Sequence, residues 1–262
     1  MPTLYPLFSG SKGNAYFLRQ SGEGILIDCG RSAKQILASL QEQNIPQNAI
    51  KAIFITHEHI DHVQGLKKLS SLAGVKVYAS AGTIRALEEK NLIGEKKEII
   101  PIDKKGTELD FMKITPFHIS HDCADGLGYK VETSDGRKTA FATDTGVITR
   151  EISSALKGCD TVVLESNHDV RMLQNGSYPY ILKRRILSDS GHLSNDQCTE
   201  TAVKLLKSGT TRLFLAHLSE ANNFPELAEQ TAVCRFKQEK MKKNVDYKLC
   251  VLGVNGGKRA IY

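Results

Sequence analysis

The sequence predicts a mixed α/β fold, because short β-branched runs alternate with amphipathic helical patterns from one end of the chain to the other. A histidine-rich motif directly follows one of these runs, at the place where a strand would end. The 262 residues are enough to bury one large core, and neither a linker nor a low-complexity tract divides them. We therefore expect a single domain over residues 1–262.

Strands are predicted where apolar, β-branched residues run for four to six positions. These runs are 24–28, 52–56, 75–78, 161–164 and 212–216. A hairpin is predicted where Ser134-Asp135-Gly136-Arg137 separates the runs 127–133 and 138–143, because Asp-Gly between such runs is a turn signal.

Three helices are predicted from apolar residues that recur at helical spacing. The first covers 33–40, where Ser32 and Gln35 have the spacing of a capping box. The second covers 195–207 and the third, longer one covers 225–241.

The composition favours a cytoplasmic protein that does not associate with a membrane. The chain has 35 Lys and Arg against 29 Asp and Glu, a net charge of +6 that suits a polyanionic partner without requiring one. No apolar run approaches the roughly 18 residues that cross a bilayer, and the first residues do not resemble a signal peptide. The six cysteines are scattered without a C-x-x-C pair, as expected for reduced thiols.

The strongest chemical signal is Thr56-His57-Glu58-His59-Ile60-Asp61-His62, which directly follows a predicted strand. Three imidazoles and a carboxylate at a strand end can point into one cleft, and these are the nitrogen and oxygen ligands that Zn²⁺, Mn²⁺ or Fe take. Residues that could complete such a site follow other strand-like runs or stand at a helix start. They are His118, His121, Asp144, Glu165, His168, His192 and His217. All eight histidines fall in these segments, which scattered structural histidines would not usually do.

The pattern His57-x-His59-x-Asp61-His62, followed by His121, Asp144 and His217, resembles the metallo-β-lactamase fold superfamily. The resemblance covers nearly the whole chain and implies an αββα sandwich, two mixed β-sheets flanked by helices, with a dinuclear metal site at one edge. The ligands it implies for the first ion are His57, His59 and His121. Those it implies for the second ion are Asp61, His62 and His217, and Asp144 would bridge both.

Two residues of this pattern have competing interpretations. His118 competes with His121 for the first ion, and we favour His121 because Gly128-Tyr129 follows it as in ribonuclease Z. Asp28 matches an early aspartate of the superfamily, and we expect it to orient a ligand histidine rather than to bind metal. Ligands of this kind accept two Zn or Mn ions, with Fe also compatible.

A closer resemblance links the chain to the YycJ/WalJ-type bacterial exonucleases. It rests on residues 9–14, 164–169, 191–195 and 217–223 taken together. It implies digestion of DNA from the 5′ toward the 3′ end. The Gly-Ser loop 9–14 would lie against the cleft, where Ser9, Ser11 and Asn14 could help bind a phosphate through backbone N–H groups.

Asp61, Glu165 and His192 are the predicted catalytic residues. Glu165 and His192 resemble a Glu and His pair of ribonuclease Z, and a histidine held by a carboxylate can protonate the alkoxide that phosphodiester cleavage expels. His168 is assigned to substrate binding, and the alternative for both Glu165 and His168 is a capping or supporting role.

Basic side chains offer a second possible contact with substrate. Lys183, Arg184 and Arg185 lie between the segments of Glu165 and His192, and residues 235–248 are also basic. In a nuclease such residues bind phosphates, and in most proteins they form a solvated helix face.

Together these observations predict a dinuclear metal-dependent phosphodiesterase, a hydrolase whose polymeric partner is nucleic acid, in the first place DNA. The alternatives are an RNA-processing or small cyclic phosphodiesterase of the same fold, or a thioester hydrolase, because a two-metal site serves all these reactions. A regulator that only binds metal is disfavoured because no predicted ligand is missing.

Overall fold

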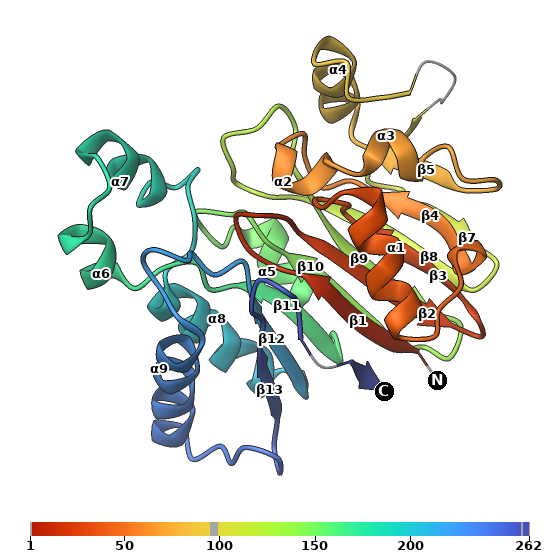
Figure 1. The fold of residues 1–262 in the computed structure, drawn as a ribbon. Helices are drawn as coiled ribbons and strands as arrows, with labels where there is room; N and C mark the ends of the chain where they lie inside the picture. The colour runs from red at the N-terminus through yellow and green to blue at the C-terminus, as the bar shows by residue number, and fades with distance from the viewer. Residues whose placement is uncertain (1, 95–98, 258, 262) are drawn as a thin grey trace.

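Two seven-stranded β-sheets pack face to face, and helices cover their outer faces (Figure 1). This arrangement is seen in a computed structural model that describes residues 2–94, 99–257 and 259–261. The predicted αββα sandwich of two mixed sheets is therefore confirmed.

The first sheet comes mostly from the N-terminal part of the chain and has the order β14-β1-β2-β3-β4-β5-β6. Its strands are β1 (Thr3–Phe8), β2 (Ala15–Gln20), β3 (Glu23–Ile27), β4 (Ile50–Phe54), β5 (Lys76–Ala79), β6 (Ile100–Pro101) and β14 (Ala260–Ile261). Pairing is antiparallel from β14 to β3 and parallel from β3 to β6.

The second sheet has the order β13-β12-β11-β10-β9-β8-β7. Its strands are β7 (Thr107–Leu109), β8 (Met112–His118), β9 (Leu127–Thr133), β10 (Lys138–Ala142), β11 (Thr161–Glu165), β12 (Arg212–Ala216) and β13 (Lys248–Val251). Pairing is antiparallel from β7 to β10 and parallel from β10 to β13, so each sheet has a parallel half.

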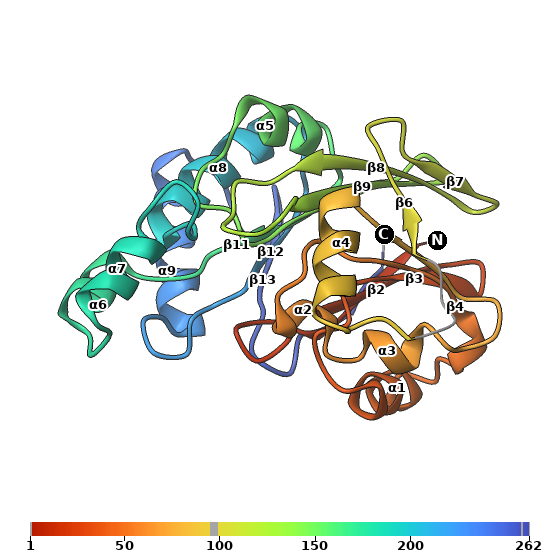
Figure 2. The same cartoon turned by 90° about the horizontal axis from the view of Figure 1, so that it is seen from above.

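The helices fall into three groups (Figures 1 and 2). On the first sheet lie α1 (Ala33–Glu42), the 3₁₀ turn η1 (Gln47–Ala49), α2 (Ile60–Val63), α3 (Leu66–Leu69) and α4 (Ala81–Glu89). On the second sheet lie α5 (Arg150–Leu156), α8 (Asn195–Lys207) and α9 (Pro225–Gln238). A short pair, α6 (Val170–Asn175) and α7 (Tyr180–Ile186), projects sideways from the body, and we call residues 170–187 the arm. No helix among the described residues is long and apolar enough to span a bilayer.

The central core lies between the sheets and is built from side chains of both. Phe54 of the first sheet stacks on Tyr78 at a centroid distance of 4.7 Å and meets the edge of Tyr129 from the second sheet at 5.5 Å. Tyr129 is fully buried, and its hydroxyl donates a hydrogen bond of 2.6 Å to the carbonyl of Ile55. The two sheets are thus joined next to the loop that begins the histidine motif.

The predicted helices are found close to their expected bounds. Ser32 and Gln35 form the capping box at the start of α1, and the helix 195–207 is confirmed as α8. The third predicted helix ends at Gln238 rather than at 241. Because the backbone amide of Thr56 donates to Asp28 instead of to a neighbouring strand, β4 ends at Phe54, two residues before the predicted end.

Candidate metal centre

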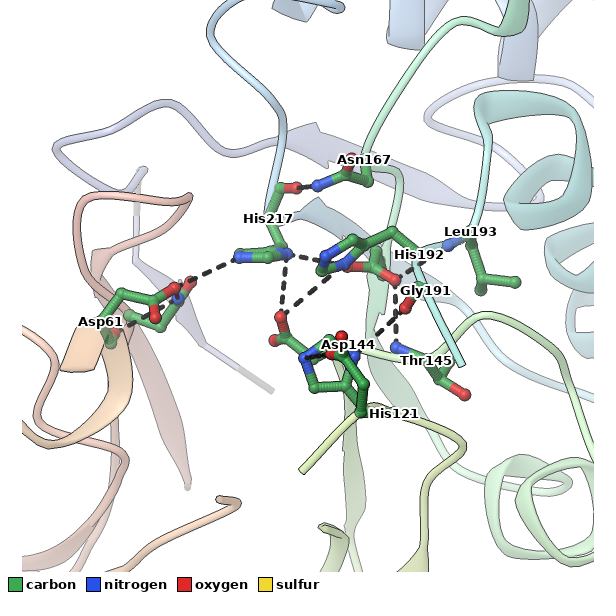
Figure 3. A network of polar contacts seen from close by, with 12 residues as sticks. Asp61, His121, Asp144, Thr145, Asn167, Gly191, His192, Leu193 and His217 are labelled. Carbon is green, nitrogen blue, oxygen red and sulfur yellow. Dashed lines mark hydrogen bonds and ion pairs between the residues drawn. The ribbon is translucent and has the colours of Figure 1, made fainter. Parts of the chain in front are cut away.

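The residues predicted to bind metal gather at one edge of the sandwich, where the parallel strands of both sheets end. One side of this edge carries His57 to His62, which follow β4 and enter α2. The other side carries side chains that follow β10 and β12 or lie between β8 and β9 (Figure 3). A cleft of about 610 Å³ opens between the two sides, and Asp61, Asp144 and His217 are among the residues that line it.

Two groups of three potential ligands meet in this cleft. His57, His59 and His121 form the first triad, and Asp61, His62 and His217 form the second. Within each triad the ligand atoms lie within 4.8 Å of one another. Asp144 also groups with His57 and His62, so its carboxylate stands where the two triads meet.

Three aspartate and histidine side chains leave their strands through a backbone conformation that is uncommon for residues other than glycine. Asp28, Asp144 and His217 have φ values of 60°, 57° and 55°, and each follows a parallel strand within two residues. Such left-handed residues persist where the surrounding structure holds them, and they cluster at functional sites. Here all three residues follow the ends of parallel strands, at the edge where the triads lie.

The ring nitrogen that faces away from the cleft is hydrogen-bonded in several of these histidines. His62 Nδ1 lies 2.7 Å from Asp28 Oδ2, and His217 Nδ1 lies 2.7 Å from Glu165 Oε1. His121 Nδ1 lies 3.2 Å from the carbonyl of Gly191. Because a carboxylate or carbonyl can only accept, Nδ1 donates, and Nε2 is the nitrogen that a neutral ring can offer to a metal.

Several buried polar atoms point into the same space and have no hydrogen-bond partner within the part of the chain that the structure describes. They are His57 Nε2, Asp144 Oδ2 and His217 Nε2. His62 Nε2 lies 3.3 Å from Asp144 Oδ2, and His217 Nε2 lies 3.6 Å from Asp61 Oδ2. Ligand atoms of one ion with bonds near 2.1 Å lie roughly 3.0–3.6 Å apart, so this nitrogen and oxygen set fits a divalent cation.

The charges of the site are strongly coupled. Burial, together with His62, His121 and His59, keeps the pKa of His57 well below its ordinary value, which leaves the ring neutral. Although burial opposes it, His62 and His217 hold the pKa of Asp61 well below the usual range for a carboxyl group. Although burial opposes it, Asp144 and the neighbouring carboxylates raise the pKa of His62 well above its ordinary value and that of His217 to about 10. Metal binding must therefore displace a proton from these two rings.

Asp28 has the orienting role that the sequence suggested. It is fully buried, accepts from His62 Nδ1, and accepts from the amide of Thr56 at 2.8 Å and from its hydroxyl. Asp28 therefore fixes the ring of His62 from behind.

The structure brings His121, and not His118, to the first triad. His118 is half-exposed and turns toward Glu151, whose Oε1 is 3.2 Å from His118 Nδ1. Its other nitrogen lies 3.6 Å from Asp125 Oδ1.

Glu165 and His192 form the pair that the sequence suggested. His192 Nδ1 donates to Glu165 Oε1 at 2.8 Å, and His192 lines the cleft. Glu165 Oε2 accepts from the backbone amides of Leu193 at 2.9 Å and Thr145 at 3.1 Å (Figure 3). Although burial opposes it, His192 and His217 keep the pKa of Glu165 well below its ordinary value, so the carboxylate is ionised.

The loop 9–14 lies beside the cleft, but only part of the prediction for it fits. Ser11 lines the cleft, whereas Ser9 and Asn14 are buried behind the metal centre. Ser9 Oγ accepts from the amide of His217 at 2.9 Å, and Asn14 Nδ2 lies 3.1 Å from His62 Nε2. The amides of Gly10 and Asn14 already donate within the protein, so they are not free for a phosphate. Ser9 therefore contacts the backbone of His217 and Asn14 contacts the ring of His62, and neither lines the cleft.

The three residues of the basic run 183–185 also differ in whether they reach the cleft. Arg185 lines the cleft and makes a two-point ion pair with Asp122, the neighbour of His121. Lys183 instead ties α7 to the end of α6, because its Nζ donates to the carbonyls of Gln174 at 2.8 Å and Gly176 at 2.7 Å. Arg184 is exposed on the arm and does not line the cleft.

His168 does not reach the cleft surface either. It is 1% exposed, and neither ring nitrogen has a hydrogen-bond partner among the described residues. Burial lowers its pKa to about 4. The structure thus favours the supporting role that was the alternative in the sequence.

A buried network of asparagine side chains was not predicted from the sequence. Asn167 Nδ2 donates to the carbonyl of His217 at 2.9 Å (Figure 3). Asn223 Nδ2 donates to the carbonyls of Ser166 and Asn167, and Asn195 bonds to Asn223 at 3.0 Å. The signal was an asparagine in each segment that carries Glu165, His192 or His217, which has no meaning before the segments are brought together.

Two cleft residues from the first side were also missed. Glu58, inside the histidine motif, accepts from the amide of Ala124 at 3.0 Å and so fixes the loop that carries His121. Lys90, at the end of α4, lines the cleft, as does Arg185. No motif in the sequence identifies Lys90 as a cleft residue, and the helix α4 that precedes it was not predicted either.

Comparisons with known proteins agree with this geometry. Residues 24–218 match the family model described as the Beta-lactamase superfamily domain. The chain is 37% identical over 247 residues to a protein of Streptococcus pneumoniae serotype 2 (strain D39) named Exodeoxyribonuclease WalJ. The aligned region covers 93% of this chain and 91% of the relative. It is 37% identical over 232 residues to a Bacillus anthracis protein named Exodeoxyribonuclease YycJ, covering 86% and 85% of the two chains.

The fold is also found among solved structures. The metallo-beta-lactamase fold protein YhfI from Bacillus subtilis superposes with a TM-score of 0.73 over 99% of this chain and 98% of the other, at 14% identity. This likeness concerns the fold alone.

Proposed function

The chain belongs to the beta-lactamase superfamily and to the same family as the relatives named WalJ and YycJ, and from this premise we propose that it is a dinuclear metal-dependent DNA exonuclease. The observation that carries the proposal is the pair of ligand triads that meet at Asp144, with His192 and Glu165 beside them. The reaction would be hydrolysis of a phosphodiester bond at a strand end.

His57, His59 and His121 would hold one ion, Asp61, His62 and His217 the other, and Asp144 would contact both. The ligand set suits Zn²⁺ or Mn²⁺, and Fe also accepts it. Two such ions, when bound, supply a nucleophile at neutral pH and neutralise charge that develops on phosphoryl oxygens.

The chain's own residues supply the remaining work. His192 faces the cleft with Nε2, because its Nδ1 is bonded to the ionised Glu165. A carboxylate behind an imidazole stabilises the protonated ring, so His192 can hold a proton at Nε2 and give it to the leaving oxygen. Asp61, whose carboxylate lies 3.5 Å from His62 Nε2 in the cleft, would keep a ligand role and so contribute to the catalytic geometry.

DNA as the substrate is supported by the relatives and by the lining of the cleft. Both relatives are named exodeoxyribonucleases. Lys90 and Arg185 both line the cleft, and their cations suit a polyanion even though Arg185 also pairs with Asp122. By resemblance, digestion would run from the 5′ toward the 3′ end. The proposal places the protein in the cytoplasm, which suits six cysteines that form no disulfide.

The test is to incubate pure enzyme, loaded with each metal in turn, with end-labelled double-stranded DNA, single-stranded DNA and RNA. We expect stepwise shortening of DNA from one end, loss of the activity with a chelator, and faster release of a 5′ label than of a 3′ label. Cleavage of RNA alone, or turnover of only cyclic phosphodiesters or thioesters, would replace the proposal by one of those activities.

A further inference from the structure

The arm bears unusually exposed apolar side chains. Tyr180 is 73% exposed and Ile181 is 82% exposed, at the start of α7. Leu187, just after the helix, is also exposed. Large side chains gathered on one projecting element indicate a binding surface, whereas scattered ones do not.

The same segment is uniformly basic. Residues 170–188 contain Arg171, Lys183, Arg184 and Arg185 but no Asp or Glu. The arm therefore joins apolar surface to positive charge, a combination that suits a ligand with anionic and apolar parts.

Helix α7 presents its apolar and cationic side chains in two neighbouring rows. Tyr180 and Arg184 are four residues apart on one row, with the guanidinium 6.0 Å from the ring centroid. Ile181 and Arg185 form the neighbouring row, and Arg185 lines the cleft. The surface thus runs from the Arg185 guanidinium at the cleft, past Arg184, to an aromatic and an aliphatic side chain farther out.

The arm is held firmly enough to present this surface. Lys183 bonds two carbonyls at the end of α6, and Arg185 is paired with Asp122. Ile186 and Leu173 are buried, and the amide of His192 donates to the carbonyl of Ile186 at 3.0 Å. A preformed surface of this kind loses little entropy on binding.

We infer that this face of α7 binds the single-stranded nucleotides next to the one in the cleft, with bases against Tyr180 and Ile181 and phosphates at Arg184 and Arg185. The inference rests on the proposed function and extends it. An unpaired strand is the occupant favoured by the observations, because its bases expose apolar faces at intervals along an anionic backbone. A protein partner of the same arm would need acidic groups to match the exposed Arg171 and Arg184, since Lys183 is bonded to two carbonyls and Arg185 to Asp122.

The test measures binding of a labelled phosphorothioate oligothymidine, about twelve nucleotides long, to the metal-loaded enzyme by fluorescence anisotropy at several salt concentrations. The variant Tyr180→Ala/Ile181→Ala should raise Kd by about 5- to 30-fold. Its salt dependence should stay unchanged because no charge is removed. Arg184→Ala should flatten the slope of log affinity against log salt by about 0.7.

Val245→Ala is the matched control, since Val245 is 77% exposed but lies in the loop before β13 and not on the arm. It should leave Kd unchanged. All variants should keep the thermal unfolding midpoint of the wild type, because the altered side chains are exposed.

Three outcomes would overturn the inference. The double variant could bind oligothymidine like the wild type. It could weaken binding of an abasic chain of the same length equally, which would exclude contact with bases. It could convert a dimer into a monomer in a molar-mass measurement, which would make the arm an interface between copies of this chain.

Failure of the proposed function gives a different result. In that case the wild type would hydrolyse bis-p-nitrophenyl phosphate but would neither bind oligothymidine nor digest DNA, and the inference would be rejected together with the function.

Discussion

The two sides of the cleft are built in different ways. The first side provides His57, His59, Asp61 and His62 from one short segment after β4. The second side provides His121, Asp144 and His217 from three loops that lie far apart in the sequence. The first side therefore depends on local geometry, whereas the second depends on how β8 to β12 are ordered in the sheet.

The supporting contacts differ in the same way. Asp28 supports His62 from the adjacent strand of the first sheet. On the second side Glu165 holds both His192 and His217, and Asn167 holds the backbone of His217. A single change on the second side should thus disturb more than one functional group.

The largest effect is expected for Asp144→Ala, which removes the carboxylate that joins the two sides. We expect activity to fall to background, because the variant should lose both ions or keep one that is loosely held. Metal content by elemental analysis and hydrolysis of DNA are the measurements. Asp110→Ala, which changes an exposed carboxylate between β7 and β8, should behave like the wild type. Two ions retained in Asp144→Ala would show that the sides do not share this ligand.

His192→Ala tests chemistry that only the second side provides. We expect kcat to fall by roughly 10²–10⁴-fold while metal content stays unchanged, because the ring would donate a proton without binding metal. The matched control His118→Ala removes a half-exposed histidine that faces Glu151 and should retain full activity. Loss of metal in His192→Ala would make His192 a ligand, and full activity would make it structural.

Asn167→Ala removes the contact that holds the backbone of His217 in its left-handed conformation. Metal affinity at the second triad should fall by about 10- to 100-fold, as for other residues that orient ligands. Competition with a metal-binding dye measures this effect. Asn175→Ala is the matched control, because Asn175 Nδ2 also donates to a backbone carbonyl, that of Arg171, but on the exposed arm. Equal metal affinity in both variants would contradict a positioning role for Asn167.

The smallest effect is expected for the dependence of stability on pH through His168. In the folded protein burial lowers its pKa to about 4, whereas the unfolded ring titrates near its ordinary value of 6.5. Between these values the unfolded state binds more protons, so the free energy of unfolding falls as pH falls through this window. The contribution is on the order of 1–3 kcal/mol.

Denaturant unfolding of the wild type and of His168→Gln, followed from about pH 7 to about pH 4, measures this contribution. The variant lacks the titrating ring, so its stability should fall less steeply than that of the wild type. Parallel curves would mean that His168 does not titrate with a lowered pKa.

The difference between the two sides of the cleft also explains which features could be predicted from the sequence. The motif His57 to His62 can be recognised in the sequence because its predicted ligands are neighbours in the chain. The Ser32–Gln35 capping box is local as well. The choice of His121 over His118 could be argued from sequence only by resemblance. The structure decides it through the course of the loop between β8 and β9.

Other features depend on tertiary contacts and were out of reach. The resemblance predicts phosphate contacts for Ser9 and Asn14, yet the loop packs against Asp61 and His217. Lys183 seemed to be a phosphate contact, but the turn between α6 and α7 brings carbonyl groups to its ammonium. The asparagine network needs three distant segments in contact before any of its members has a partner.

If the two sides together hold two metal ions at Asp144, elemental analysis of the purified protein titrated to saturation will count them. We expect two ions per chain for the wild type. A single tightly bound ion at saturation would contradict it.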